Sequence, residues 1–370
     1  MALSDNISSV VTAIGNAIKG KQATLVSGDN IKTVNSQSIL GSGDLVISGG
    51  IASPAGSIGS VQYNNNGSTG GAANVDIVDG DLVLSVSDAT IPQTGTLKLF
   101  AKQYGNTRTI PAAMGASGMD YALQPAIWRQ KVGHWNPPGG SATLPAVWGF
   151  PAFTAVGTAT SRVAASTNLL TRMRRLGYVS AATAGSLTSL YHGITQYTTG
   201  TGTGLGGFYF ESTFAFSDAA AVAGARGFVG MQSSTAAPTN VEPSTLVNCV
   251  GIAQLSTDST QLYIVYGGSA AQTAIALGTG FPPYNGTVGI TTGVPYRFSI
   301  WSPPSANGQV NWQVERLGTN TKTVGTLTGV VGTAIPASTT MLGVRAWRTN
   351  NATALAVGMD LSSFYIETDY

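Results

Sequence analysis

The sequence predicts a mainly β protein: a short N-terminal helix, small β-modules, and a C-terminal antiparallel β-sandwich of jelly-roll or lectin type. Three observations predict it. One stretch near the N-terminus has helical periodicity, about eight stretches beyond residue 161 have the period of a strand, and 48 of the 370 residues are Gly. Hydrophobic residues make up 43% of the chain, which is enough for a sizeable core.

The first element is an amphipathic helix over residues 1–20, which we expect to serve attachment or oligomerisation. Its apolar residues recur at spacings of three and four and so form one stripe. They are Ile7, Val10, Val11, Ile14, Ala17 and Ile18. An isolated helix of this length is marginal in water, so the stripe needs a partner. The stripe covers only two heptads, fewer than the three or four that predict a coiled coil. The helix therefore either docks on another domain or protein, or forms a short homotrimeric bundle.

The sequence of residues 21–97 predicts small β-modules that together form a shaft. Short β-prone runs alternate with turn signals such as Gly28-Asp29-Asn30. The segment "SGDLVI" at 42–47 is similar to the segment "DGDLVL" at 79–84. Strands this short do not bury a core alone, so we expect several chains to supply each other's missing core.

Residues 98–160 read as an ordered but irregular connector. Prolines and glycines are frequent, as in Pro137-Pro138-Gly139-Gly140, and such runs do not sit inside regular elements. Trp128, Trp135 and Trp148 also fall here, and we expect these large aromatic side chains to pack against a neighbour.

Residues 161–370 read as the β-sandwich. In "FYFESTFAF", which begins at Phe208, large apolar side chains alternate with smaller or polar ones, as in a strand with one face on a core. No helical period interrupts the region. The candidate strands are 207–216, 226–231, 246–255, 261–267, 296–302, 310–317, 340–348 and 354–369.

Three segments resemble proteins of tailed bacteriophages. "LVSGDNIKTVNSQSILGSGDLVI" is similar to a segment of phage tail fibres, and so is "GSVQYNNNGSTGGA". "KLFAKQYGNTRTIPAAMGASGMDYALQP", at 98–125, is similar to a connector of phage structural proteins. The resemblance implies the tail-fibre or receptor-binding family, a homotrimer, and a place in the virion (the phage tail) after synthesis in the host cytoplasm.

Global composition argues against several other classes. Eighteen basic and sixteen acidic residues give a net charge of +2, too small for a nucleic-acid footprint. Long charge-free stretches are rich in Pro, Thr, Ser and Gly, which would leave polar groups stranded in lipid, so no membrane span is expected. Cys249 is the one cysteine, and its apolar flanks predict a small buried hydrophobe. We expect neither a cofactor nor a metal.

Catalysis finds little support in the sequence. Glycoside hydrolysis needs two carboxylates on one sugar bond. Glu211 and Glu315 lie on separate strands and could approach each other, but each also fits a solvent-facing position of an alternating strand. His134 and His192 are the two histidines, and they are far apart in the sequence.

Two loops, "IWSPPSANGQ" at 300–309 and "WRTNNAT" at 347–353, combine aromatic, amide and hydroxyl groups, which suit the apolar faces and polar rims of sugars. Binding residues tend to lie on loops. Their candidate receptor-binding residues are Trp301, Asn307, Trp347, Arg348, Asn350 and Asn351. The competing interpretation places the tryptophans in the core and the asparagines in turns. A basic run, Arg172-Met173-Arg174-Arg175, reads as a solvated sheet edge or as a contact with an anionic partner.

The prediction for function is a tail fibre that recognises a host surface glycan or protein through its C-terminal sandwich, without catalysis. Its expected partners are its own copies, other virion proteins through the N-terminal region, and the host receptor. Two alternatives stay open: a head-fibre, decoration or collar protein that binds another virion component, and a glycan-degrading tail spike.

Overall fold

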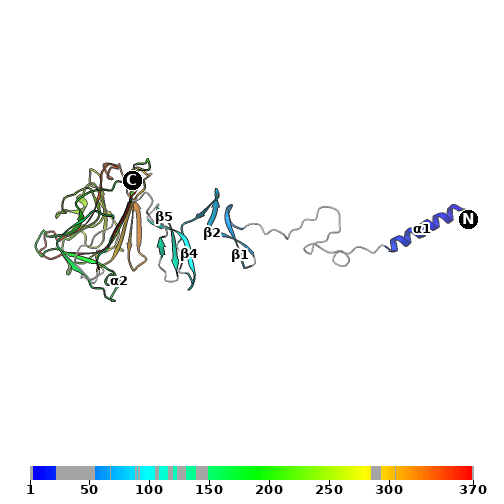
Figure 1. The fold of residues 1–370 in the computed structure, drawn as a ribbon, viewed down its shortest axis with the longest axis horizontal. Coiled ribbons are helices and arrows are strands. Elements are labelled where there is room, and N and C mark those ends of the chain that lie inside the picture. The colour runs from blue at the N-terminus through cyan, green and yellow to red at the C-terminus, as the bar shows by residue number, and fades with distance from the viewer. Residues whose placement is uncertain are drawn as a thin grey trace. The chain divides into compact units, whose positions relative to one another are not determined.

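The computed structural model describes residues 3–21, 55–66, 68–87, 90, 92–104, 108–115, 120–122, 131–138, 149–284, 293–304 and 306–368. The chain divides into two compact units, Met1–Ser85 and Val86–Tyr370. The predicted mainly β fold, with a short helix first and a sandwich last, is confirmed (Figure 1).

The first unit contains helix α1 (Leu3–Lys21) and one small sheet. All the described side chains of α1 are exposed, and the predicted apolar stripe is open to solvent in the single chain, with Ile14 54% and Val11 63% exposed. The sheet is antiparallel, in the order β1 (Ser60–Asn65), β2 (Ser68–Val78), β3 (Asp81–Leu84). The strands predicted over 23–47 lie outside the described residues.

The second unit begins with another small antiparallel sheet, in the order β4 (Leu97–Tyr104), β5 (Arg108–Gly115), β6 (Asp120–Ala122). Phe100, Ala112 and Met114 form its buried cluster. Such a small cluster offers far less buried apolar area than the sandwich that follows.

Two larger antiparallel sheets form the sandwich. The eight-stranded sheet has the order β19 (Lys322–Thr326), β18 (Asn311–Arg316), β17 (Tyr296–Ser302), β12 (Phe208–Phe216), β21 (Gly358–Thr368), β10 (Leu176–Val179), β9 (Thr158–Ser161), and β7 (Lys131–Trp135) also pairs with β21. The seven-stranded sheet has the order β16 (Ile275–Ala276), β15 (Tyr263–Gly267), β14 (Cys249–Gln254), β13 (Arg226–Gln232), β20 (Gly343–Thr349), β11 (Leu187–His192), β8 (Phe153–Val156). Short helices α2 (Leu169–Arg172) and η1 (Pro243–Thr245) lie in the connections.

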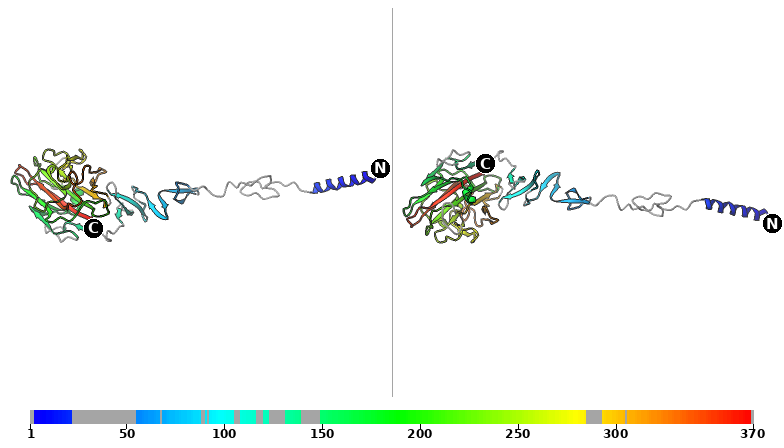
Figure 2. Two further views of the ribbon diagram at one scale, coloured as in Figure 1. Left: turned by 90° about the horizontal axis from the view of Figure 1, so that it is seen from above. Right: turned by 90° about the horizontal axis from the view of Figure 1, so that it is seen from below.

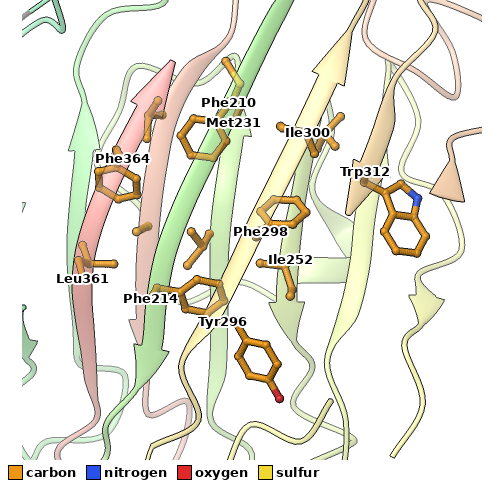
Figure 3. Packing of buried hydrophobic residues seen from close by; sticks show 14 of the residues in the cluster. Phe210, Phe214, Met231, Ile252, Tyr296, Phe298, Ile300, Trp312, Leu361 and Phe364 are labelled. Atoms are coloured by element: carbon orange, nitrogen blue, oxygen red, sulfur yellow. The ribbon is translucent and has the colours of Figure 1, made fainter. Parts of the chain in front are cut away.

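The core lies between the two sheets. Inward side chains of the eight-stranded sheet, such as Phe210, Phe298 and Phe364, meet those of the seven-stranded sheet, such as Met231 and Ile252 (Figure 3). These side chains are fully buried. Because successive residues of a strand point to opposite faces, the residues between them are directed to the outer face of the sheet, and this alternation positions the candidate site.

The last strand, β21, organises the eight-stranded sheet. In both views of Figure 2 this red strand runs through the middle of the sandwich, as its pairing with β12 on one side and with β10 and β7 on the other requires. The register with β12 shifts between Thr213 and Phe214, because Ser362 of β21 has no partner across the pair. Such a bulge bends its strand and increases the local twist.

The predicted connector over 98–160 needs correction. This range contains β4 and β5, and its later strands β7, β8 and β9 belong to the sandwich sheets. The Trp135 side chain is fully buried and contacts Phe153 and Phe364, so it is a core residue of the sandwich. Trp128 and Trp148 lie outside the described residues.

The connection between β8 and β9 shows how the chain changes sheets there. Gly157 joins these strands with a φ of +87°, and a Cβ atom here would lie 2.6 Å from Thr188 Oγ1 and 2.7 Å from the Val179 carbonyl oxygen. Only glycine fits a backbone that is both left-handed and this closely approached.

Candidate functional site

The two outer faces of the sandwich differ in chemistry. On the seven-stranded sheet the outer face is apolar, and the β13–β14 connection, which contains η1, folds over it. Phe228, Cys249 and Trp347 are buried there beneath Val241 and Leu246 of that connection. The chain therefore closes this face itself, and the expected burial of Cys249 is confirmed.

This closure corrects the predicted receptor contacts in the 347–353 segment. Trp347 is 1% exposed and stacks on Phe228, with 6.2 Å between the ring centroids. Arg348 is fully buried on the other side of β20, where Asp218 accepts hydrogen bonds of 2.5 Å from its Nε and Nη2. Side chains enclosed in this way contact their own domain rather than a ligand at its surface.

Asn350 is a structural residue as well. Its side chain is buried, and its Nδ2 donates hydrogen bonds of 2.8 Å to the carbonyl oxygens of Thr183 and Leu355. Asn351 is half-buried in a left-handed turn with a φ of +52°. It lies at the surface, and its proposed role in binding stays a prediction.

The second predicted loop follows β17. Trp301 is half-buried near the end of that strand, and Asn307 is exposed in the turn that leads to β18. The glycine-rich segment after Tyr197 packs against this turn, with Gly308 N donating to the Gly200 carbonyl oxygen at 2.8 Å. Asn307 thus lies on the connection between β17 and β18, just beyond Trp301, whereas Asn351 lies on a separate connection between β20 and β21.

The outer face of the eight-stranded sheet is polar and partly exposed. Strand register aligns its side chains in three rows across the strands. The first row is Thr326, Asn311, Trp301, Tyr209 and Glu367; the second is Val324, Gln313, Ser299, Glu211, Tyr365 and His134; the third is Lys322, Glu315, Arg297, Thr213 and Ser363. We call these residues the polar face.

Ion pairs and hydrogen bonds fix the centre of the polar face. Arg297 lies between two carboxylates, with its Nε 3.6 Å from Glu211 and its Nη1 3.3 Å from Glu315. Glu211 also accepts hydrogen bonds from Tyr209 Oη at 2.7 Å and from Ser299 Oγ at 3.2 Å. Such a network holds each group in one orientation and leaves the face preformed.

An aromatic side chain meets amide and hydroxyl groups at the end of the first row. Asn311, the cross-strand partner of Trp301, accepts a hydrogen bond from Thr326 Oγ1 at 2.7 Å and lies 3.3 Å from Gln309 Nε2. The half-exposed indole of Trp301 therefore stands beside a fixed array of polar groups. Sugars carry apolar C–H faces and polar rims, so this arrangement suits one.

His134 lies at the opposite end of the second row. Neighbouring atoms that displace part of its hydration and the charge of Arg174 lower the pKa of His134, an effect that the charge of Glu211 partly opposes. The ring is therefore neutral at pH 7, and Asn136 Nδ2 lies 3.3 Å from its Nδ1. A neutral imidazole offers a ring and hydrogen-bonding groups without a net charge.

The structure brings Glu211 and Glu315 to the same face, but one guanidinium stands between them. Both are the outward residues that strand alternation predicted. Glu211 accepts from groups of the chain on several sides. In the described residues no group of three His, Cys, Asp or Glu side chains is placed to hold a metal ion.

The basic run near β10 divides into two environments. Arg172 and Arg174 are exposed, as expected of a solvated edge. Arg175 instead is buried and donates from Nε to Asp360 at 2.7 Å, and Arg162 donates to the same carboxylate at 3.0 Å. The aspartate partner lies 185 residues away, so the local sequence gives no sign of this ion pair.

A hollow lined by none of the polar-face residues lies between α2 and the turn that follows β18. Its volume is about 360 Å³, and Leu169, Arg316 and Thr319 are among the residues that line it. It contains none of the residues predicted from the sequence, and it provides a comparison site for binding experiments. No helix among the described residues is long and apolar enough to cross a membrane.

Comparison with known proteins yields structural likeness only. No family model matches the chain, and no curated protein matches it. Solved structures with a similar fold include peanut lectin (11% identity, 65% of this chain and 97% of that chain, TM-score 0.41) and basic winged bean lectin (10% identity, 65% and 98%, TM-score 0.38). A protein of unknown function from Shewanella oneidensis MR-1 is also similar (10% identity, 65% and 86%, TM-score 0.37).

The candidate site is thus defined by its own side chains. The predicted role of Asn307 stays a prediction. The sequence singled out Trp301 but gave no sign of Tyr209, Tyr365 and Gln313. Strand alternation placed these three outward, but only the pairing of β12, β21 and β18 with β17 brings them onto one face.

Proposed function

We propose that this chain recognises a glycan, without catalysis, through the polar face of its eight-stranded sheet. The half-exposed indole of Trp301, beside the Gln309 amide and the Thr326 hydroxyl that the buried Asn311 side chain holds in place, is the observation that carries the proposal. A preformed surface of this kind binds at little cost in side-chain ordering.

In this proposal the chain is a virion fibre protein that recognises a host receptor. The likeness of residues 23–47 to a segment of phage tail fibres, and of residues 98–125 to a connector of phage structural proteins, supports the virion role. The exposed apolar stripe of α1 supports a homotrimer, in which three sandwiches would bind one surface together. Linked sites can raise the overall avidity by factors of about 10²–10⁴ without any new contact.

Glycan binding is tested with the purified full chain on an array of bacterial surface polysaccharides and oligosaccharides. We expect selective binding that falls at least about tenfold in Trp301→Ala, because a central tryptophan contact is commonly worth 2 kcal/mol or more. Val247→Ala is the matched control, since Val247 is exposed on the β13–β14 connection over the seven-stranded sheet, outside the polar face, and it should bind as the parent does.

A second experiment distinguishes receptor recognition from the alternative in which the chain binds another virion component. Purified protein is added to phage and host, and the remaining adsorption is measured. Inhibition of adsorption by the parent chain but not by Trp301→Ala supports receptor recognition. Binding to purified capsid or baseplate with no effect on adsorption would favour the head-fibre, decoration or collar alternative.

A further inference from the structure

Four ring-bearing residues cross the polar face as a continuous line, which we call the aromatic track. Trp301 on β17 is the cross-strand partner of Tyr209 on β12. The Tyr209 ring lies 6.3 Å from that of Tyr365 on β21, and Tyr365 lies 6.1 Å from His134 on β7, both edge to face. The track thus spans four adjacent strands.

Exposure varies along the track. Trp301 and Tyr365 are half-buried and His134 is exposed, whereas Tyr209 between them is 6% exposed. Tyr209 supports its neighbours from below rather than offering a ring face of its own. The track therefore has two accessible platforms on β17 and β21, followed by an imidazole on β7.

The platforms are too far apart for one sugar ring. Strand β12 separates β17 from β21, and neighbouring strands lie about 4.8 Å apart. Tyr365 is also displaced by two residues, about 6.8 Å, along its strand from the position level with Trp301, so the two platforms are roughly 12 Å apart. A single pyranose on Trp301 does not reach Tyr365. A ligand that contacts both must be a chain of several sugar units that lies across the strands.

Charge on the face is compensated by the chain. Arg297 is held between Glu211 and Glu315, and Lys322 is the cross-strand partner of Glu315. Glu367 accepts a hydrogen bond from Tyr365. The carboxylates beside the track would repel a uronic acid or a phosphate, and Arg297 between two of them already has acidic partners.

We propose that the polar face binds an extended, uncharged oligosaccharide that lies across the strands along the aromatic track, from Trp301 to Tyr365 and on towards His134. This inference rests on the proposed glycan recognition and adds the length, direction and charge of the ligand. Arg174 is the exposed cation whose charge acts on His134, so any binding of acidic glycans is expected to depend on it.

The test uses the full chain with malto-, cello- and manno-oligosaccharides of one to six units, and with oligogalacturonates of the same lengths. Binding is measured by calorimetry and by the part of the tryptophan fluorescence change that is lost in Trp301→Ala, since the chain has six tryptophans. For at least one neutral series, affinity should rise at least tenfold between one and four units and then level off. Tyr365→Ala should remove most of this rise and leave the affinity for one or two units nearly unchanged, whereas Val247→Ala, outside the polar face, should keep the whole profile.

The experiment distinguishes a failure of this inference from a failure of the proposed glycan recognition. Equal affinity for one and six units, or preference for the oligogalacturonates that is lost in Arg174→Gln, would overturn this inference and leave glycan recognition standing. Binding to no oligosaccharide on the panel would count against the proposed function and this inference together. Thermal unfolding of each variant shows whether its fold is intact.

Discussion

Arg348 and Asp218 form an ion pair in which both side chains are completely buried. The guanidinium also donates to Gln254 Oε1 at 3.0 Å and to Tyr284 Oη, and it stacks over the Phe216 ring at 4.2 Å. In the sequence, Arg348 stands in a polar segment that resembles a binding loop. In the fold, Arg348 on β20 is paired with Asp218 just after β12, and Asp218 also accepts a hydrogen bond from Gly358 N at the start of β21. The buried ion pair thus links the ends of these three strands.

Removal of the Arg348 charge should destabilise the sandwich. Arg348→Met leaves the Asp218 carboxylate buried without its partner, and breaking such a pair costs about 3–5 kcal/mol. The free energy of unfolding in urea measures the loss. Arg172→Met changes an exposed arginine and should stay within about 0.5 kcal/mol of the parent. A loss below 1 kcal/mol in Arg348→Met would contradict the structural role.

Acid should destabilise the fold through His192. The side chain is 1% exposed against the Phe153 ring, and burial lowers its pKa to about 3. The unfolded chain takes up the proton near pH 6.5. Stability is therefore fully present above that pH and falls as the pH drops towards 3, by about 3 kcal/mol between pH 7 and pH 4.

A comparison with His192→Gln isolates this effect. Glutamine can still accept a hydrogen bond from Val344 N, which lies 3.4 Å from His192 Nδ1. The carboxylates titrate in both proteins, so the difference between their pH profiles reports the histidine. Parallel profiles between pH 7 and pH 4 would show that His192 contributes nothing to the acid response.

Oligomerisation should depend on the stripe of α1. We expect a mass in solution of three times the 37.7 kDa chain, because the exposed apolar stripe needs partners. Ile7→Asp with Ile14→Asp places charges in the stripe and should weaken the trimer, whereas Ser8→Asp with Asn16→Asp adds the same charge elsewhere on the helix. Sedimentation equilibrium measures all three proteins. A parent chain that stays monomeric and folded refutes the proposed assembly.

The polar face should bind without cleaving. Arg297 separates Glu211 from Glu315 and keeps both carboxylates engaged with the chain. After incubation with the polysaccharide that binds best, the parent protein should release no new reducing ends. Release that disappears in Glu211→Gln would establish the tail-spike alternative instead.

Much of the sandwich could be predicted from the sequence. The eight candidate strands all form, because their alternation encodes one face on the core, as in Phe208–Phe216. Strands β7, β8 and β9 were missed because Pro- and Gly-rich segments surround them and most of their apolar contacts come from distant residues. Their membership in the sheets depends on pairing with β21, β11 and β10.

The candidate site was predictable only in part. Trp301 and Trp347 stand in similar polar contexts, yet the first is half-exposed and the second is buried. The difference comes from the β13–β14 connection, which covers Trp347 from about a hundred residues away in the sequence. Likewise, the rows of the polar face depend on strand register, which a single strand does not encode.

The most direct test of glycan recognition by the polar face is a crystal structure of the full chain with the neutral oligosaccharide that binds best. We predict sugar rings over Trp301 and Tyr365, with the chain running across β17, β12 and β21. An oligosaccharide bound in the hollow beside α2, or over the seven-stranded sheet, with the polar face empty would contradict the account.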